Sequence, residues 1–149
     1  MAISSLEASK KLCELSNWTM THLKVHKILY IANMVYLGRN KKPLINENFE
    51  AWTHGPVLPG LYDKLKIFSS LPIPSYVFSN SCIDKVQKEE EVKALEEAWE
   101  KLKNKEAWEL VAITHRKKGA WIKHYQPYGN NLIPNESILK EYEDVITER

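Results

Sequence analysis

Hydrophobic residues are densest between positions 21 and 38, where they fall on nearly every face of a predicted helix. The apolar positions are Leu23, Val25, Ile28, Leu29, Tyr30, Ile31, Ala32, Met34, Val35, Tyr36 and Leu37. A helix that is apolar all round is surrounded by other elements. Thr21 is a candidate N-cap and Gly38 a candidate left-handed stop. The pattern therefore predicts a buried central helix over about 21–38.

Elsewhere apolar positions recur with the helical period on one face only, which is typical of helices that cover a core. Such helices are predicted from a Ser4–Glu7 capping box to about 15, over 59–68, from Asp84 to about 103, after Asn104 and from Asn135 onward. In the helix after Asn104, Trp108 and His115 are expected to share the inward face. The chain is thus predicted to be mainly α.

Strand signals are short. Residues 49–52 and 76–79 are the two candidates, and we expect at most a small β-hairpin between them. Pro72 and Pro74 prevent a helix over 69–75, so that stretch is predicted to be a turn inside the domain. With 149 residues and no internal repeat, the sequence predicts one compact helical bundle over 1–149 around the central helix.

Composition favours an intracellular protein. Its two cysteines, Cys13 and Cys82, form no bridge framework and are predicted to be reduced. The first residues lack an apolar signal core, and charged or polar residues interrupt the most apolar run, so neither export nor a membrane span is expected. The predicted location is the cytoplasm, with no membrane partner.

A rigid loop follows the central helix. Pro56 and Pro59 each fix a backbone angle, and Gly55 tolerates angles that other residues avoid. The loop is therefore expected to hold Trp52 and His54 on a stiff mount. A tryptophan beside Gly-Pro commonly locks a turn onto the core, and this structural role is the favoured interpretation for Trp52, Gly55 and Pro56.

Three blocks of residues together resemble the Panacea domain family, which includes the SocA-like, phage-associated proteins. The matched positions are Thr21, Lys24, Lys27, Leu29, Tyr30, Ala51, Trp52, Gly55, Pro56, Val57, Pro59, Tyr62, Thr114, His115 and Trp121. The blocks follow the family's order and spacing over nearly the whole chain. The segment Trp-x-x-Gly-Pro-Val makes this resemblance more specific than any single motif.

The resemblance implies a non-catalytic protein that recognises other proteins. Members of the family resemble antitoxins that neutralise co-encoded toxins by direct binding, and SocA-like members include adaptors that deliver a toxin to a protease. The implied partner is a protein toxin from a neighbouring gene, with a cytoplasmic protease as a further partner. The candidate partner-binding residues are Lys24, Lys27, Tyr30, Trp52, His54, Tyr62, His115 and Trp121. Gly55, Pro56, Val57 and Thr114 are assigned to the structural motif.

Two interpretations of Lys24, Lys27 and Tyr30 remain open. Spaced three residues apart, they stagger along one side of the central helix and are suited to form a cationic, aromatic-rimmed patch for a partner's carboxylate or phosphate. Alternatively, the lysine stems run past the core while Tyr30 bonds a backbone carbonyl.

Catalytic and metal motifs are weak. His22 and His26 lie four residues apart, as zinc ligands do, but the H-E-x-x-H pattern and a third ligand are missing, so two half-exposed histidines are the favoured interpretation. Neither cysteine sits in a nucleophile motif. Five glycines leave little room for a phosphate-binding loop. We therefore predict no enzyme, no cofactor and no metal.

Charge alternates along the chain although the net charge is only +2. An acidic stretch over 84–100 and a basic stretch over 101–126 offer two docking surfaces, and the acidic one is favoured because toxins that act on RNA are often basic. The alternative is a nucleic-acid-binding regulator that uses the basic stretch, with Trp108, Trp121 and Tyr125 as stacking groups. The oligomeric state stays open.

Overall fold

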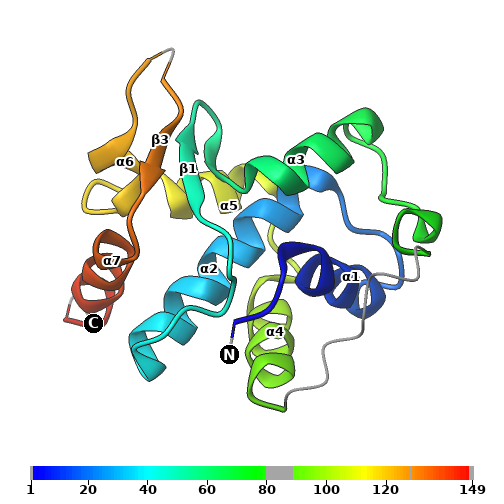
Figure 1. Ribbon diagram of the computed structural model, residues 1–149, viewed down its shortest axis with the longest axis horizontal. Helices are drawn as coiled ribbons and strands as arrows, with labels where there is room; N and C mark the ends of the chain where they lie inside the picture. Colours follow the sequence, from blue (N-terminus) through cyan, green and yellow to red (C-terminus); the bar gives the residue numbers. More distant parts are fainter. Residues whose placement is uncertain (1, 80–88, 128, 148–149) are drawn as a thin grey trace.

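The computed structural model describes residues 2–79, 89–127 and 129–147, and helices dominate it (Figure 1). The elements in order are α1 (Ser5–Leu15), α2 (His22–Asn40), β1 (Phe49–Trp52), β2 (Gly55–Val57), α3 (Pro59–Leu65), the 3-10 helices η1 (Lys66–Phe68) and η2 (Ser75–Phe78), α4 (Glu89–Leu102), α5 (Ala107–Thr114), α6 (Ala120–His124), β3 (Asn131–Ile133) and α7 (Asn135–Thr147). The mainly α prediction is confirmed.

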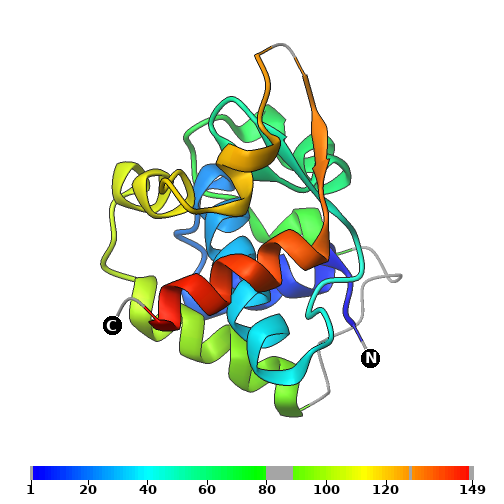
Figure 2. The ribbon, with the colours of Figure 1, turned by 90° about the vertical axis from the view of Figure 1, so that its left-hand side faces the viewer.

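Helix α2 runs through the middle of the molecule and is the element around which the others pack (Figure 1). It contacts α1, α4, α5, α7 and β2. Val25, Ile28 and Leu29 are at most 1% exposed, as the all-round apolar pattern predicted. Figure 2 shows α7 crossing in front of α2. The buried central helix is therefore confirmed.

The end of α2 differs from the prediction. Gly38 lies inside the helix, which continues to Asn40, and Lys41 adopts the left-handed conformation that ends it. A Cβ atom at Gly38 would lie 2.1 Å from Tyr142 Cδ2 on α7. Gly38 therefore serves close packing between two helices, not the helix stop that its type suggested.

Helix starts were predicted with mixed success. The Ser4–Glu7 capping box is present, with the Glu7 amide donating to Ser4 Oγ at 3.1 Å. Helix α5 begins after Glu106, not at a cap on Asn104, because Glu106 and Glu109 form their own capping box. The predicted Asp84–Gln87 cap of α4 lies outside the described residues.

The predicted inward face of α5 is wrong. Leu110 and Thr114 are buried, whereas Trp108 is 72% exposed. Leu110 and Thr114 lie on one face of the helix, and the predicted pair Trp108 and His115 lie on another. In an eight-residue helix, the periodicity of apolar residues allows either face to be the inner one. Packing places Trp108 outside.

A small antiparallel sheet flanks α2, with strand order β2-β1-β3. The predicted strand 49–52 is confirmed, but its predicted partner 76–79 is wrong, because η2 occupies Ser75–Phe78. Strand β1 instead pairs with β2 across the two-residue turn 53–54 and with β3 from the far end of the chain. The rigid loop is thus itself one strand of the hairpin.

Within residues 2–79, 89–127 and 129–147, no helix is both long and apolar enough to cross a bilayer.

Candidate functional site

The β1–β2 turn and the strand after it form a corner that is fastened to α2 by a buried lysine. Lys27 is 1% exposed, and its Nζ donates to the Pro56 carbonyl oxygen at 2.9 Å. Burial lowers the pKa of Lys27 to about 7, because the charged ammonium loses its hydration. The amine therefore sits near half protonation at neutral pH.

Gly55 lets the corner approach its neighbours closely. Its φ of +122° belongs to a region that side chains rarely adopt. A Cβ atom there would lie 2.8 Å from Lys27 Cε and 3.2 Å from His115 Nε2. Glycine is thus required both by the backbone angle and by the space, and the structural assignment of Gly55 has a physical reason.

His26 is buried and fixed in one tautomer. It is 1% exposed, and its Nδ1 accepts a hydrogen bond from the Leu58 amide at 3.2 Å. A nitrogen that accepts carries no proton in the neutral ring, so Nε2 must carry it. Nε2 is buried and has no hydrogen-bond partner. Burial, followed by the charges of Lys27 and His22, holds the pKa of His26 well below its usual value.

Two further imidazoles near Lys27 also have buried nitrogens without partners. These are Nδ1 of His22 and Nε2 of His115. Burial lowers the pKa of both rings, and the nearby Lys27 charge lowers it further. The expectation that His22 and His26 are both half-exposed is correct for His22 only, because His26 faces inward on α2.

A cavity of about 430 Å³, called here the corner cavity, opens beside these groups. Its walls include His22, His26, Lys27, Trp52, His54 and Tyr62. The Tyr62 ring contacts Trp52 edge-on, with centroids 4.8 Å apart, and lies 5.2 Å from the His22 ring. The cavity therefore combines aromatic walls with basic groups.

Trp121 ties α6 to the corner. Its Nε1 donates to the Trp52 carbonyl oxygen at 2.6 Å, and its ring stacks on His115 with centroids 3.7 Å apart and planes 3° apart. The Tyr125 ring also stacks on Trp121, with centroids 4.7 Å apart. Trp121 is 7% exposed, so it supports the corner from the interior of the protein.

Tyr30 lies away from the corner. Its hydroxyl donates to Glu141 Oε1 of α7 at 2.5 Å, and the same carboxylate accepts from Arg116 Nε at 2.9 Å and from the Ala120 amide at 3.0 Å. Burial and the Glu141 charge raise the pKa of Tyr30 well above its usual value. The alternative in which Tyr30 bonds a backbone carbonyl is wrong, because its partner is a carboxylate.

Sequence reasoning missed Glu141 as well as the full burial of His26. Glu141 is 1% exposed and three residues after the buried Ile138. A charged residue on the apolar stripe of the predicted terminal helix was the available signal.

The structure brings most of the predicted site residues together. Around the corner lie Lys27, Trp52, His54, Gly55, Pro56, Val57, Tyr62, His115 and Trp121. Lys24 is half-buried and does not line the corner cavity, and buried Thr114 donates to the Val111 carbonyl within its own helix. The predicted patch of Lys24, Lys27 and Tyr30 therefore does not form as one surface.

In the described part of the chain, no three histidine, cysteine or acidic side chains gather as a metal site. The Nε2 of His26 carries a proton, since Nδ1 accepts the Leu58 bond, so that nitrogen has no free lone pair for a metal.

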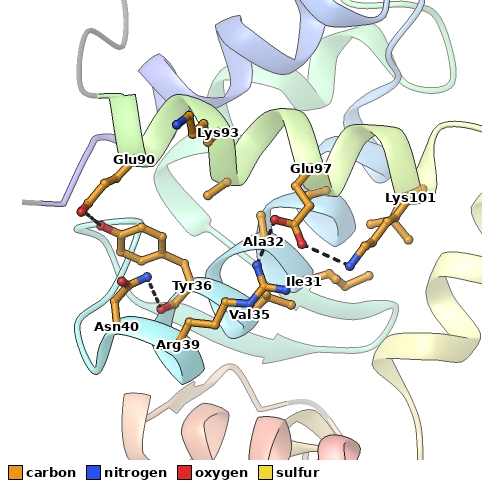
Figure 3. Close-up of a pocket in the computed structure, with 13 residues that line it drawn as sticks. Ile31, Ala32, Val35, Tyr36, Arg39, Asn40, Glu90, Lys93, Glu97 and Lys101 are labelled. Atoms are coloured by element: carbon orange, nitrogen blue, oxygen red, sulfur yellow. Dashed lines mark hydrogen bonds and ion pairs between the residues drawn. The ribbon is translucent and has the colours of Figure 1, made fainter.

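A second cavity of about 280 Å³ lies between α2 and α4 (Figure 3). Its floor is apolar, with Ile31 and Val35 among its residues. The charges on its rim already pair, since Glu97 binds Arg39 at 2.9 Å and Lys101 at 3.1 Å. This groove therefore lacks the unsatisfied polar groups that mark the corner cavity.

Fold and site together define a small helical protein that holds a histidine-rich corner against its central helix. Residues 25–122 match the family described as Antitoxin SocA-like, Panacea domain, and the chain belongs to this family. Antitoxin SocA of Caulobacter vibrioides (strain NA1000 / CB15N) is 27% identical over 124 residues, covering 76% of this chain. The chain spans 64% of the length of that relative. No solved structure matches the chain.

Proposed function

We propose that this protein is an antitoxin that binds a protein toxin encoded by a neighbouring gene in the cytoplasm, and that it has no chemistry of its own. Membership of the SocA-like family supports this function. The observation that carries it is the convergence of α2, the β1–β2 turn and α3 on one cavity at the surface. Delivery of the bound toxin to a protease is a second step that the same binding would permit.

The corner is better suited to binding than to reaction. Lys27 has the lowered pKa of a reactive amine, but its Nζ donates to the Pro56 carbonyl oxygen at 2.9 Å and so holds the turn in place. Among the described residues that line the cavity there is no carboxylate and no thiol to act as base or nucleophile. The corner therefore presents donors and aromatic walls instead of a catalytic pair.

We place the docking surface at the corner and not on the acidic helix. On α4, Glu89 pairs with Lys93 at 3.0 Å and Glu97 pairs with Arg39 at 2.9 Å, so much of its charge is neutralised locally. His54, in contrast, is exposed on the turn beside the cavity. This side chain is positioned to meet a partner without disturbing the core.

The nucleic-acid alternative receives less support from the geometry. Trp121 is buried, His115 and Tyr125 both stack on it, and one face of Tyr125 is occupied by Trp121. Trp108 is exposed, but a lone aromatic side chain does not form a stacking platform. Lys103 also pairs with Glu100 at 2.9 Å.

Co-expression with the product of the neighbouring gene tests the proposal. Wild-type protein should restore growth and co-purify with the toxin. His54→Glu should lose both, because it places a negative charge on the exposed turn, whereas Glu143→Gln on the exposed face of α7 should retain both. Failure of the wild-type protein both to restore growth and to co-purify would refute the antitoxin function.

A further inference from the structure

The corner cavity gathers basic groups without a counter-charge. His22 and His26 from α2 and His54 from the turn line it together with Lys27. None of the described residues in its lining is acidic, and Lys27 forms no ion pair within the described chain. Burial, and after it the Lys27 charge, lowers the pKa of His22 and His26, so a positive charge on either ring would meet repulsion from Lys27. A bound anion would relieve that repulsion.

Two buried groups at the cavity also require hydrogen-bond acceptors. The proton of His26 Nε2 has no acceptor, and a buried donor without a partner costs free energy. An ammonium at Lys27 has three donors, of which one goes to the Pro56 oxygen. Both needs would be met by one group that accepts several hydrogen bonds.

The backbone adds to this preference for negative charge. His22 is the first residue of α2, and Thr21 at the N-cap forms no side-chain cap bond. The cavity is therefore lined by the first two turns of a 19-residue helix, at the end where its dipole is positive.

The amount of charge decides which anion fits. Burial holds His22 and His26 toward the neutral form, so among the described α2 residues of the lining Lys27, near half protonation at neutral pH, is the main source of positive charge, and a bound anion would favour its protonated form. One ammonium balances a singly charged group. The Trp52 and Tyr62 rings supply apolar walls for the methylenes that carry such a group.

We propose that the corner cavity binds one carboxylate presented by the partner protein, with His26 Nε2 and Lys27 Nζ as its hydrogen-bond donors. The carboxylate belongs to an aspartate, a glutamate or the chain terminus of that partner. This assignment rests on the proposed function, because it identifies which group of the toxin the corner recognises.

Acetate is the probe, because it carries the proposed group without the rest of a partner. Imidazole nitrogen and lysine side-chain signals are followed by NMR while acetate is added to the full chain at pH 6.5. The signals of His26 and Lys27 should move saturably. Lys27→Met should weaken acetate binding at least about tenfold, since a charge-assisted bond is lost. Lys24→Met, on the same helix but outside the cavity, should bind as the wild type does.

Inorganic phosphate is titrated in parallel. Phosphate binding more tightly than acetate, an unsaturable response of the wild type, or equal binding by Lys27→Met would each overturn the proposal. His22→Ala, which changes a half-exposed residue of the lining, provides a second weakened variant should Lys27→Met not fold. The titration needs no toxin, so its outcome is independent of the growth and co-purification assay that tests the antitoxin function.

Discussion

At the scale of single residues, Lys27 explains why the corner is both firm and electrostatically unusual. The Lys27 side chain is buried, and its Nζ donates a hydrogen bond to the carbonyl oxygen of Pro56. A leucine at this position would leave that carbonyl without its donor. Burying the amine costs free energy, and the hydrogen bond that fixes the turn offsets part of this cost.

Lys27→Met should change how stability depends on pH. The pKa of Lys27 is about 7 in the folded chain and 10.5 as its reference value, so the unfolded chain binds more protons between these limits. The free energy of unfolding of the wild type should therefore rise with pH from about 7 to 10.5 relative to the variant, by at most about 5 kcal/mol. Urea unfolding at several pH values measures the difference.

Lys24→Met is the control for that experiment and should keep the pH profile of the wild type. The groups that face Lys27 are His22 and His26 from α2, His54 from the turn and His115 at the C-cap of α5. The pKa values of His22, His26 and His115 are lowered from 6.5, so these rings titrate below the window. A flat difference between wild type and Lys27→Met above pH 7 would contradict the assignment of the lowered pKa.

At the scale of elements, Glu141 joins three parts of the fold. Its carboxylate on α7 receives bonds from Tyr30 of α2, from Arg116 and from the backbone at the start of α6. These contacts hold α7 against α2 where the glycine at position 38 allows the helices to approach. A buried carboxylate with this many donors is stable because each donor is satisfied by the same group.

Glu141→Gln should destabilise the fold by about 2 to 3 kcal/mol, because Arg116 loses its charged partner and one acceptor oxygen becomes a donor. Chemical denaturation measures the loss. Glu143→Gln, two residues later and exposed, should stay within about 0.5 kcal/mol of the wild type. Equal effects of the two substitutions would show that the buried network does not hold the helices together.

Much of the element order could be predicted, and the errors share one cause. The central helix and the strand 49–52 follow from local patterns, since both carry their signal within the segment. The strand partner at 76–79 and the inward face of Trp108 depend on what packs against each segment. Several candidate site residues, including Lys27 and Trp52, were proposed from the family resemblance. The role of Glu141 could be seen only once the fold showed which groups bond to its carboxylate.

At the scale of the whole molecule, charge is distributed as local pairs and not as one field. Lysines 93, 101 and 103 each bind a glutamate on α4. Lys101 and Lys103, at the start of the basic stretch, are therefore neutralised by glutamates of the acidic stretch. Such a surface gives little long-range attraction for a polyanion.

Binding to nucleic acid should accordingly be weak. Fluorescently labelled single- and double-stranded oligonucleotides, titrated at 50 mM and 200 mM salt, should show little binding at either concentration. A true nucleic-acid binder that neutralises several phosphates loses about a thousandfold or more in affinity over a similar range. A steep loss of this kind would favour the regulator hypothesis over the antitoxin function.

The indole ring at position 52 forms part of the cavity wall, and the one at 121 supports it through the backbone carbonyl. A guest in the cavity would alter the surroundings of the first ring directly and those of the second through this bond. Intrinsic tryptophan fluorescence should therefore change when the corner cavity is occupied, and binding could be followed without any attached dye.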